Sequence, residues 1–334
     1  MSSFTTSRPR ALTAGAVLAV SALTLAGCAA ATPVEDDGTI TVVASTIVYG
    51  DLVSTLGGDA VTITSLIDSA AQDPHSYEAS ARDQLAVSEA ELVIVNGGGY
   101  DPFAEALYEA AGEGAILVTA VDESGLLEDD DHADDDHADD DHAADEADDH
   151  TTDDGHDHIE GFNEHVWYSF HAMEHIAEHI TEELISLSPD DADLFNTNLD
   201  GYLSDLEGLE AQADTIAETS GDRGAAVTEP VAVYLLEAVG LHNDTPTDFT
   251  EAIEEGSDVP PSALLEVLAL VEDDHIALLA YNDQTSSPET ERVRLTAVEA
   301  GLPVVSFTET LPEGSDYVEW MSSNLDALAV ALAQ

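Results

Sequence analysis

One amphipathic pattern, about thirty residues long, separates this chain into two halves. It begins at Ser188, a side chain typical of helix starts, and continues with Pro189 and two acids that suit the positive end of a helix dipole. Apolar residues then recur at alternating four- and three-residue steps, namely Phe195, Leu199, Tyr202, Leu206, Leu209, Ala213 and Ile216. The spacing predicts one long rigid helix over residues 188–220 that joins the two halves.

Strand-like and helix-like segments alternate on both sides of this helix. Before it, runs rich in β-branched residues predict strands at 39–45, 61–67, 92–95 and 115–118, with helices at 80–89 and 103–111. After it, strands are predicted at 224–228, 275–281 and 303–307, and a helix at 318–332 closes the chain. Such alternation indicates parallel βαβ units. We therefore expect an α/β protein of two lobes, 39–187 and 221–334, each with a mainly parallel sheet flanked by helices.

The first residues have the order of a secretory signal. Arg8 and Arg10 precede an apolar run over 11–26, which ends in Leu-Ala-Gly and then Cys28. An uncleaved membrane helix is the alternative, but the run is shorter than the roughly 20 residues that a span needs. The ending resembles the bacterial lipoprotein box. This implies a signal peptide over 1–27, lipid attachment at Cys28, a tether over 28–38, and a protein anchored to the cell membrane outside the cytoplasm.

Charge and cysteine content restrict the partners. The chain has 71 Asp and Glu residues against six Lys and Arg, a formal net charge of −65. Nothing in it could neutralise phosphates, which excludes nucleic-acid binding, whereas cations are attracted. Cys28 is the only cysteine, so the chain has no disulfide and any zinc-type site must use His and carboxylate ligands.

A segment over 128–158 combines acids and histidines at a fixed interval. Residues 129–143 read DDDHADDDHADDDHA, three copies of a five-residue unit. So polar a segment cannot bury enough apolar area to fold, and we expect a disordered loop. Imidazole and carboxylate groups bind zinc, and the regular interval favours an auxiliary metal loop over a solvated acidic linker. Its histidines are His132, His137, His142, His150, His156 and His158.

Four short motifs follow predicted strands or the acidic loop. They are DPHSY at 73–77, EHVW at 164–167, TEP at 228–230 and YNDQT at 281–285. Ligand sites of open α/β sheets gather at the strand ends, so these motifs can place imidazoles and carboxylates from both lobes together. A closed set of such ligands binds a divalent metal without leaving a position for a reacting water, which indicates a binding protein and not an enzyme.

These motifs resemble those of the zinc- and manganese-binding solute-binding lipoproteins of bacterial ABC metal importers. The DPHSY and HVW motifs imply that His75 and His165 are metal ligands. The stretches Glu254-Glu255-Gly256 and Glu309-Thr310-Leu311-Pro312 are also similar to the family. The resemblance further implies a monomer that delivers its ion to a membrane permease and ATPase.

The third ligand position leaves the metal open. Glu229 stands where many zinc members have His and manganese members have Glu, and Asp283 is the candidate fourth ligand, unless it only caps a helix. Zn²⁺ is favoured because the His-rich loop is typical of zinc members, and Mn²⁺ is the alternative.

Two other functions share these residues. His171-Ala-Met-Glu174-His175 and His175-Ile-Ala-Glu178-His179 each match HxxEH, a zinc peptidase signature. Because the two copies overlap on one helix, a solvated face or an auxiliary weak metal site explains them better. A surface lipoprotein that only buffers metal, with no transporter partner, is the other alternative.

Overall fold

The computed structural model describes residues 38–69, 72, 74, 77–112, 114–127, 159, 161–221 and 223–334. The expected signal peptide, Cys28 and the His-rich loop over 128–158 lie outside these residues, and so does His75. Within the described residues, no helix combines the length and the apolarity that crossing a membrane requires.

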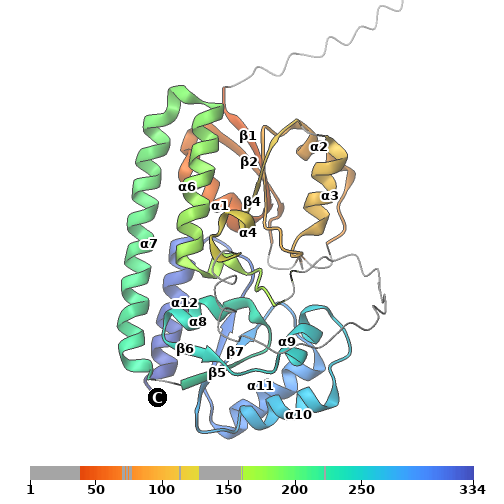
Figure 1. Cartoon of the computed structure of the whole chain (residues 1–334), viewed down its shortest axis with the longest axis vertical. Coiled ribbons are helices and arrows are strands. Elements are labelled where there is room, and N and C mark those ends of the chain that lie inside the picture. The colour runs from red at the N-terminus through yellow and green to blue at the C-terminus, as the bar shows by residue number, and fades with distance from the viewer. Residues whose placement is uncertain are drawn as a thin grey trace, which may run out of the picture. The chain divides into compact units, whose positions relative to one another are not determined.

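The N-terminal lobe is built on a four-stranded parallel sheet with the order β2-β1-β3-β4 (Figure 1). Its strands are β1 (Ile40–Thr46), β2 (Val61–Ile67), β3 (Leu92–Val95) and β4 (Ile116–Thr119). The helices of this lobe are α1 (Ile47–Gly57), α2 (Ala81–Glu89), α3 (Pro102–Ala111) and α4 (Ala120–Glu123). One face of the sheet packs against α2 and α3, and the other face packs against α1. Both faces are therefore covered, as the near-continuous apolar strands require.

The C-terminal lobe repeats this order as β6-β5-β7-β8, again all parallel. Its strands are β5 (Arg223–Val227), β6 (Leu241–Asn243), β7 (Ile276–Asn282) and β8 (Val304–Phe307). Its helices are α8 (Val233–Ala238), α9 (Thr247–Glu254), α10 (Pro261–Leu270), α11 (Pro288–Ala300) and α12 (Tyr317–Leu332). The expected fold class of two parallel-sheet lobes flanked by helices is thus confirmed.

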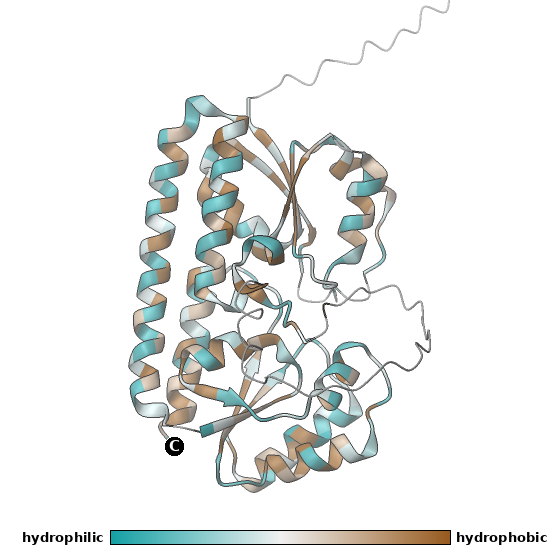
Figure 2. Ribbon diagram, viewed as in Figure 1, coloured by the Kyte–Doolittle hydropathy of each residue, from teal (hydrophilic) through white to brown (hydrophobic). Residues whose placement is uncertain are grey.

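The chain between the two sheets forms two antiparallel helices, α6 (Phe170–Leu187) and α7 (Ala192–Ser220) (Figure 1). The predicted long helix is confirmed, with one difference at its start: residues Pro189–Asp191 form a 3-10 turn, and the α-helix begins at Ala192. Apolar and polar residues are interspersed along α7 (Figure 2), and its predicted apolar positions are buried, except for Leu199, which is half-buried. α7 packs against α1 and α6 of one lobe and against α8 and α12 of the other.

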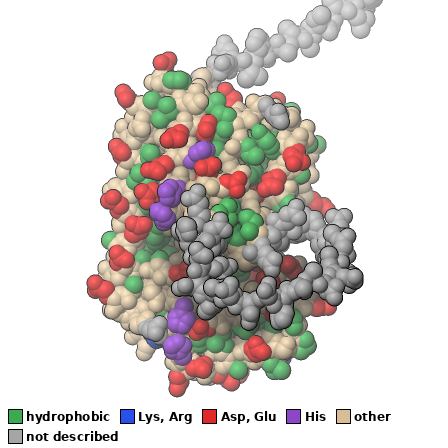
Figure 3. Space-filling view, in the orientation of Figure 1, with side chains coloured by type: hydrophobic (Ala, Val, Ile, Leu, Met, Phe, Trp, Pro, Cys, Tyr) green, Lys and Arg blue, Asp and Glu red, His purple; other side chains and the backbone are tan. Residues whose placement is uncertain are grey.

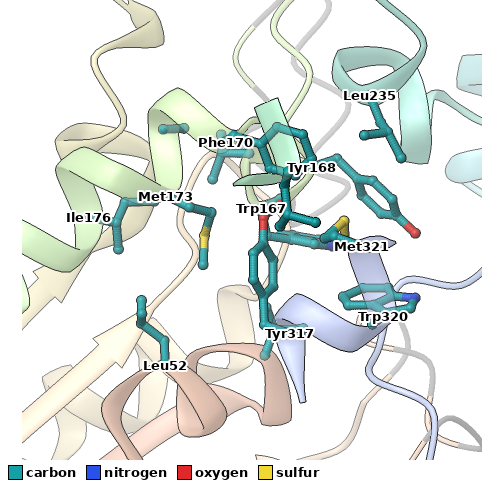
Figure 4. Close-up of a cluster of buried hydrophobic side chains, with 14 of the residues drawn as sticks. Leu52, Trp167, Tyr168, Phe170, Met173, Ile176, Leu235, Tyr317, Trp320 and Met321 are labelled. Carbon is teal, nitrogen blue, oxygen red and sulfur yellow. Dashed lines mark hydrogen bonds between the residues drawn. The ribbon is translucent and has the colours of Figure 1, made fainter. Parts of the chain in front are cut away.

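An aromatic cluster joins the two lobes (Figure 4). Trp167 and Tyr168 lie in the 3-10 helix η2 (Val166–Tyr168), and Tyr317 and Trp320 lie in α12. The Tyr317 hydroxyl donates to the Trp167 carbonyl at 2.7 Å, and the Tyr168 and Trp320 rings lie 5.4 Å apart. One apolar core therefore continues from the first sheet to the second.

Candidate metal centre

His165 lies at the start of η2 with a side chain that is almost wholly buried. Asn163 Oδ1 accepts from the His165 backbone N–H at 3.2 Å, which fixes the orientation of the amide, since only its oxygen can accept. The same Oδ1 lies 2.8 Å from His165 Nδ1. Nδ1 must therefore carry the proton, and Nε2 is the nitrogen that can bind a metal.

Glu229 follows β5 and is also buried. Its carboxylate accepts from Asn282 Nδ2 at 2.6 Å and from the Thr285 hydroxyl. Asn282 Nδ2 also donates to Glu309 Oε1 at 2.7 Å, and the Tyr100 hydroxyl donates to Glu309 Oε2 at 3.1 Å. A single asparagine thus holds the carboxylates of Glu229 and Glu309 side by side.

Two further glutamates approach His165. The ligand atoms of Glu164, His165 and Glu254 all lie within 4.8 Å of one another, and Glu254 Oε1 is 3.8 Å from His165 Nδ1. Burial, with added repulsion from the neighbouring glutamates, raises the pKa of Glu254 to about 9.

Fixed positive charge is scarce in this chain, which has six Lys and Arg against 71 Asp and Glu. The chain contains no Lys. Among its arginines, Arg294 pairs with Glu291 at 2.9 Å, and Arg223 Nε donates to the Ser220 carbonyl at 2.7 Å. Glutamates gathered in a low-dielectric site need either protons or a bound cation. The donor set therefore suits a divalent metal ion.

A cavity of about 370 Å³ opens between the lobes beside these groups. Its lining from the N-terminal lobe includes Asn163 and Glu164, and its lining from the C-terminal lobe includes Pro230, Thr250 and Glu254. The cavity between the lobes therefore reaches Glu164 and Glu254.

The structure brings two of the four candidate ligands to one region. His165 and Glu229 are joined through Asn163, whose Nδ2 donates to the carbonyl of Pro230 at 3.0 Å. His75 lies outside the described residues, although its neighbours Pro74 and Tyr77 are described. Asp283 is exposed after β7, while the preceding Asn282 points to Glu229. The structure thus does not place Asp283 with the buried donors.

Sequence reasoning did not assign ligand roles to Glu164, Glu254 or Glu309. Glu309 lies two residues past the end of β8, as Glu229 does past the end of β5, and that position was the signal that could have found it. Glu254 ends α9, so only the folded chain brings it to His165.

The overlapping HxxEH copies lie on the solvent side of α6. His171 and His175 approach each other, with their Nε2 atoms 3.2 Å apart, whereas His179 lies 3.4 Å from Glu123. The side chain of His171 is 62% exposed and that of Glu174 is 45% exposed, so the first copy of the motif is open to solvent.

Two parallel-sheet lobes joined by a long helix, with buried His and carboxylate donors where they meet, define a substrate-binding protein for a metal ion. The chain belongs to the ZnuA family, the periplasmic component A of zinc-uptake complexes, which it matches over residues 42–331. Proteins of this family are substrate-binding components of ABC importers and work with a permease and an ATPase; they are not enzymes. The family resemblance inferred from the motifs is confirmed.

Proteins similar to this chain are named for different metals. The chain is 26% identical over 332 residues to the manganese-binding lipoprotein MntA of Halalkalibacterium halodurans, covering 95% of this chain and 97% of the relative. It is 23% identical to the iron ABC transporter substrate-binding lipoprotein MtsA of Streptococcus pyogenes, covering 88% and 89%. The periplasmic zinc-binding protein TroA of Treponema pallidum has the same fold, with a TM-score of 0.66, 18% identity, and coverage of 89% and 100%.

Proposed function

We propose that this protein captures Zn²⁺ between its lobes and delivers it to the permease and ATPase of an ABC importer. The ligands proposed are His75, His165 and Glu229, with Glu309 as the fourth in place of Asp283. The pairing of Glu229 and Glu309 through Asn282 carries this proposal, because it holds two acceptor groups together where the lobes meet.

The geometry of the described donors supports this assignment. The hydrogen bond from His165 Nδ1 to Asn163 leaves Nε2 for the metal. Asn282 Nδ2 and the Tyr100 hydroxyl each donate to the carboxylate of Glu309. Ligands that are oriented by outer hydrogen bonds in this way bind a metal more tightly, because less ordering is needed on binding.

Zinc is proposed on chemical grounds. Affinity at nitrogen and oxygen sites rises from Mn²⁺ to Zn²⁺, and the His-rich segment over 128–158 suits zinc as a collector. Manganese is the second candidate, because carboxylates make up half of the proposed ligands and suit a hard cation. The names of MntA and MtsA show that related proteins serve other metals.

We also propose that the protein acts as a monomer held to the outer side of the membrane by lipid on Cys28. The loop histidines would then collect metal close to the anchored lobes, and the buried donors would retain it.

The test is metal analysis of protein stripped with a chelator and dialysed against equal concentrations of Zn²⁺ and Mn²⁺. We expect one tightly held zinc per chain, and replacing His165 with Ala should remove it. Retention of manganese in preference to zinc would overturn the choice of metal. Normal zinc uptake in cells that lack the protein would instead favour passive metal buffering.

A further inference from the structure

A second group of metal-ligating side chains lies on the surface of the C-terminal lobe. His242 lies in β6, Asp244 follows that strand, and His275 precedes β7. Their ligand atoms all lie within 4.8 Å of one another. His242 Nε2 is 3.5 Å from Asp244 Oδ1, and the two imidazole rings are centred 5.6 Å apart. Figure 3 shows histidines gathered in two places among acidic side chains on one face of the molecule.

The sheet forms a notch for these three side chains. Gly224 in β5 pairs with His242 on one side and with Ile276, the neighbour of His275, on the other. A Cβ atom on Gly224 would lie only 1.8 Å from Asp244 Oδ2. The Asp244 carboxylate therefore occupies the space that a side chain on the central strand would fill.

The backbone on both sides of the notch is held in place. The Asp244 N–H donates to the Ala225 carbonyl at 3.0 Å, and the His275 N–H donates to Asp273 Oδ1 at 2.9 Å. Asn243 and Thr245 line the cavity between the lobes. Since side chains alternate along an extended chain, His242 and Asp244 face away from that cavity. The group is thus separate from the metal centre.

The chemistry of the group fits a borderline divalent ion. Two ligands at about 2.0–2.1 Å from a tetrahedral zinc lie roughly 3.4 Å apart, close to the separation already present between His242 and Asp244. Two imidazoles select zinc-type metals over Mg²⁺ and Ca²⁺, which prefer oxygen ligands. We propose that His242, Asp244 and His275 form a second, surface site for Zn²⁺, with its remaining position open to water.

The test uses the full chain and Zn²⁺ alone, with free Zn²⁺ set by a chelator buffer. Long-range ¹H–¹⁵N NMR reports each imidazole nitrogen, and single His242→Gln and His275→Gln variants assign the signals. We expect one nitrogen of each ring to shift along the same binding curve. Asp244→Asn should weaken that curve at least tenfold, while His165→Ala should leave it unchanged.

The matched control is the double variant Glu272→Gln/Asp274→Asn, which removes two exposed charges beside His275 and keeps all three ligands. Its binding curve should stay within twofold of the parent. A loss of affinity as large as that of Asp244→Asn would mean that general negative charge attracts the ion. Two different binding curves for the two rings would mean that the rings do not bind the same ion. Either result would overturn the proposal.

Discussion

At the scale of single residues, Asn163 connects the chemistry of the site to the arrangement of the lobes. Its Oδ1 sets the protonation of His165, and its Nδ2 donates to Pro230 of the other lobe. The backbone carbonyl of Asn163 also accepts from the Tyr234 hydroxyl at 2.7 Å. One side chain thus determines which imidazole nitrogen is available and where the facing lobe lies relative to it.

Replacing Asn163 with Ala should therefore lower zinc affinity by about 10–100-fold, the usual effect of losing a hydrogen bond that orients a metal ligand. Asn163→Asp, which keeps an acceptor for Nδ1, should lose much less. Titration calorimetry against a competing chelator measures both. Equal affinity of the Ala variant and the parent would show that Asn163 does not orient His165.

Glu309 and Asp283 give a direct comparison of two candidate fourth ligands. Because Glu309 is buried beside Glu229 and Asp283 is exposed, Glu309→Gln should weaken zinc binding by orders of magnitude. Asp283→Asn should change it by less than about threefold, the scale of a screened surface charge. The same calorimetric competition serves here, and the reverse ranking would restore Asp283 to the site.

The raised pKa of Glu254 predicts a pH dependence for the metal-free protein. The pKa of the folded state, about 9, lies above the ordinary value of 4.5, so the folded state favours the protonated carboxyl. This contribution to stability is complete below about pH 4.5 and is lost as the pH rises through about 9. Melting temperatures measured with chelator from pH 5 to 9 should fall more steeply for the parent than for Glu254→Gln. Parallel profiles would contradict the assignment.

The motifs singled out part of this candidate site. Glu229 belongs to a short motif just after a strand, where parallel sheets expose their ligands, and His165 belongs to a short motif that follows the acidic loop. Asn282 and Asp283 are adjacent in sequence, and only the direction of each side chain decides which one faces Glu229, a choice that composition and spacing do not contain. The approach of Glu254 to His165 depends on how α9 packs, which is equally non-local.

At the scale of elements, prediction succeeded where a pattern was long or strongly apolar. The period of α7 and the runs of β1, β2 and β3 were found within a residue or two of their observed ends, apart from the 3-10 turn at Pro189–Asp191. β6 was not predicted, because three residues are too few to show an alternation. The pairing of β6 with β5 completes the strand order of the second sheet, which the sequence pattern did not show.

The buried stripe of α7 can be tested against its exposed side. Leu206→Ala removes a side chain that is packed in the core and should lower the free energy of unfolding by about 2–5 kcal/mol. Leu194→Ala, on the same helix but exposed, is the matched control and should change it by less than about 0.5 kcal/mol. Urea denaturation followed by circular dichroism gives both values; similar losses would contradict the packing described.

At the scale of the whole molecule, α7 and the shared core limit how the lobes can move. α7 packs against helices of both lobes, and the backbone N–H of Tyr317 in α12 donates to Asp51 of α1 at 2.9 Å. A wide hinge rotation would have to break this continuous apolar packing. Small tilts and rearrangements of loops near the cavity leave it intact.

We therefore expect metal binding to change the distance between the lobes by no more than a few ångströms, in contrast to hinge-type closure. Spin labels at positions 85 in α2 and 265 in α10, both exposed, report this distance by pulsed electron resonance in a Cys28→Ser background. Distance distributions recorded with and without zinc should nearly coincide. A shift of about ten ångströms or more would show that the lobes rotate.

The aromatic cluster also makes the protein its own optical reporter. The chain has two tryptophans, and the ring of Trp167 lies 5.2 Å from that of His165, whereas Trp320 stacks edge-on with Tyr168. Any change in the charge of the His165 imidazole acts at close range on one indole. With the metal bound at His165 as proposed, emission from Trp167, isolated by Trp320→Phe, would follow metal binding in real time without an added dye.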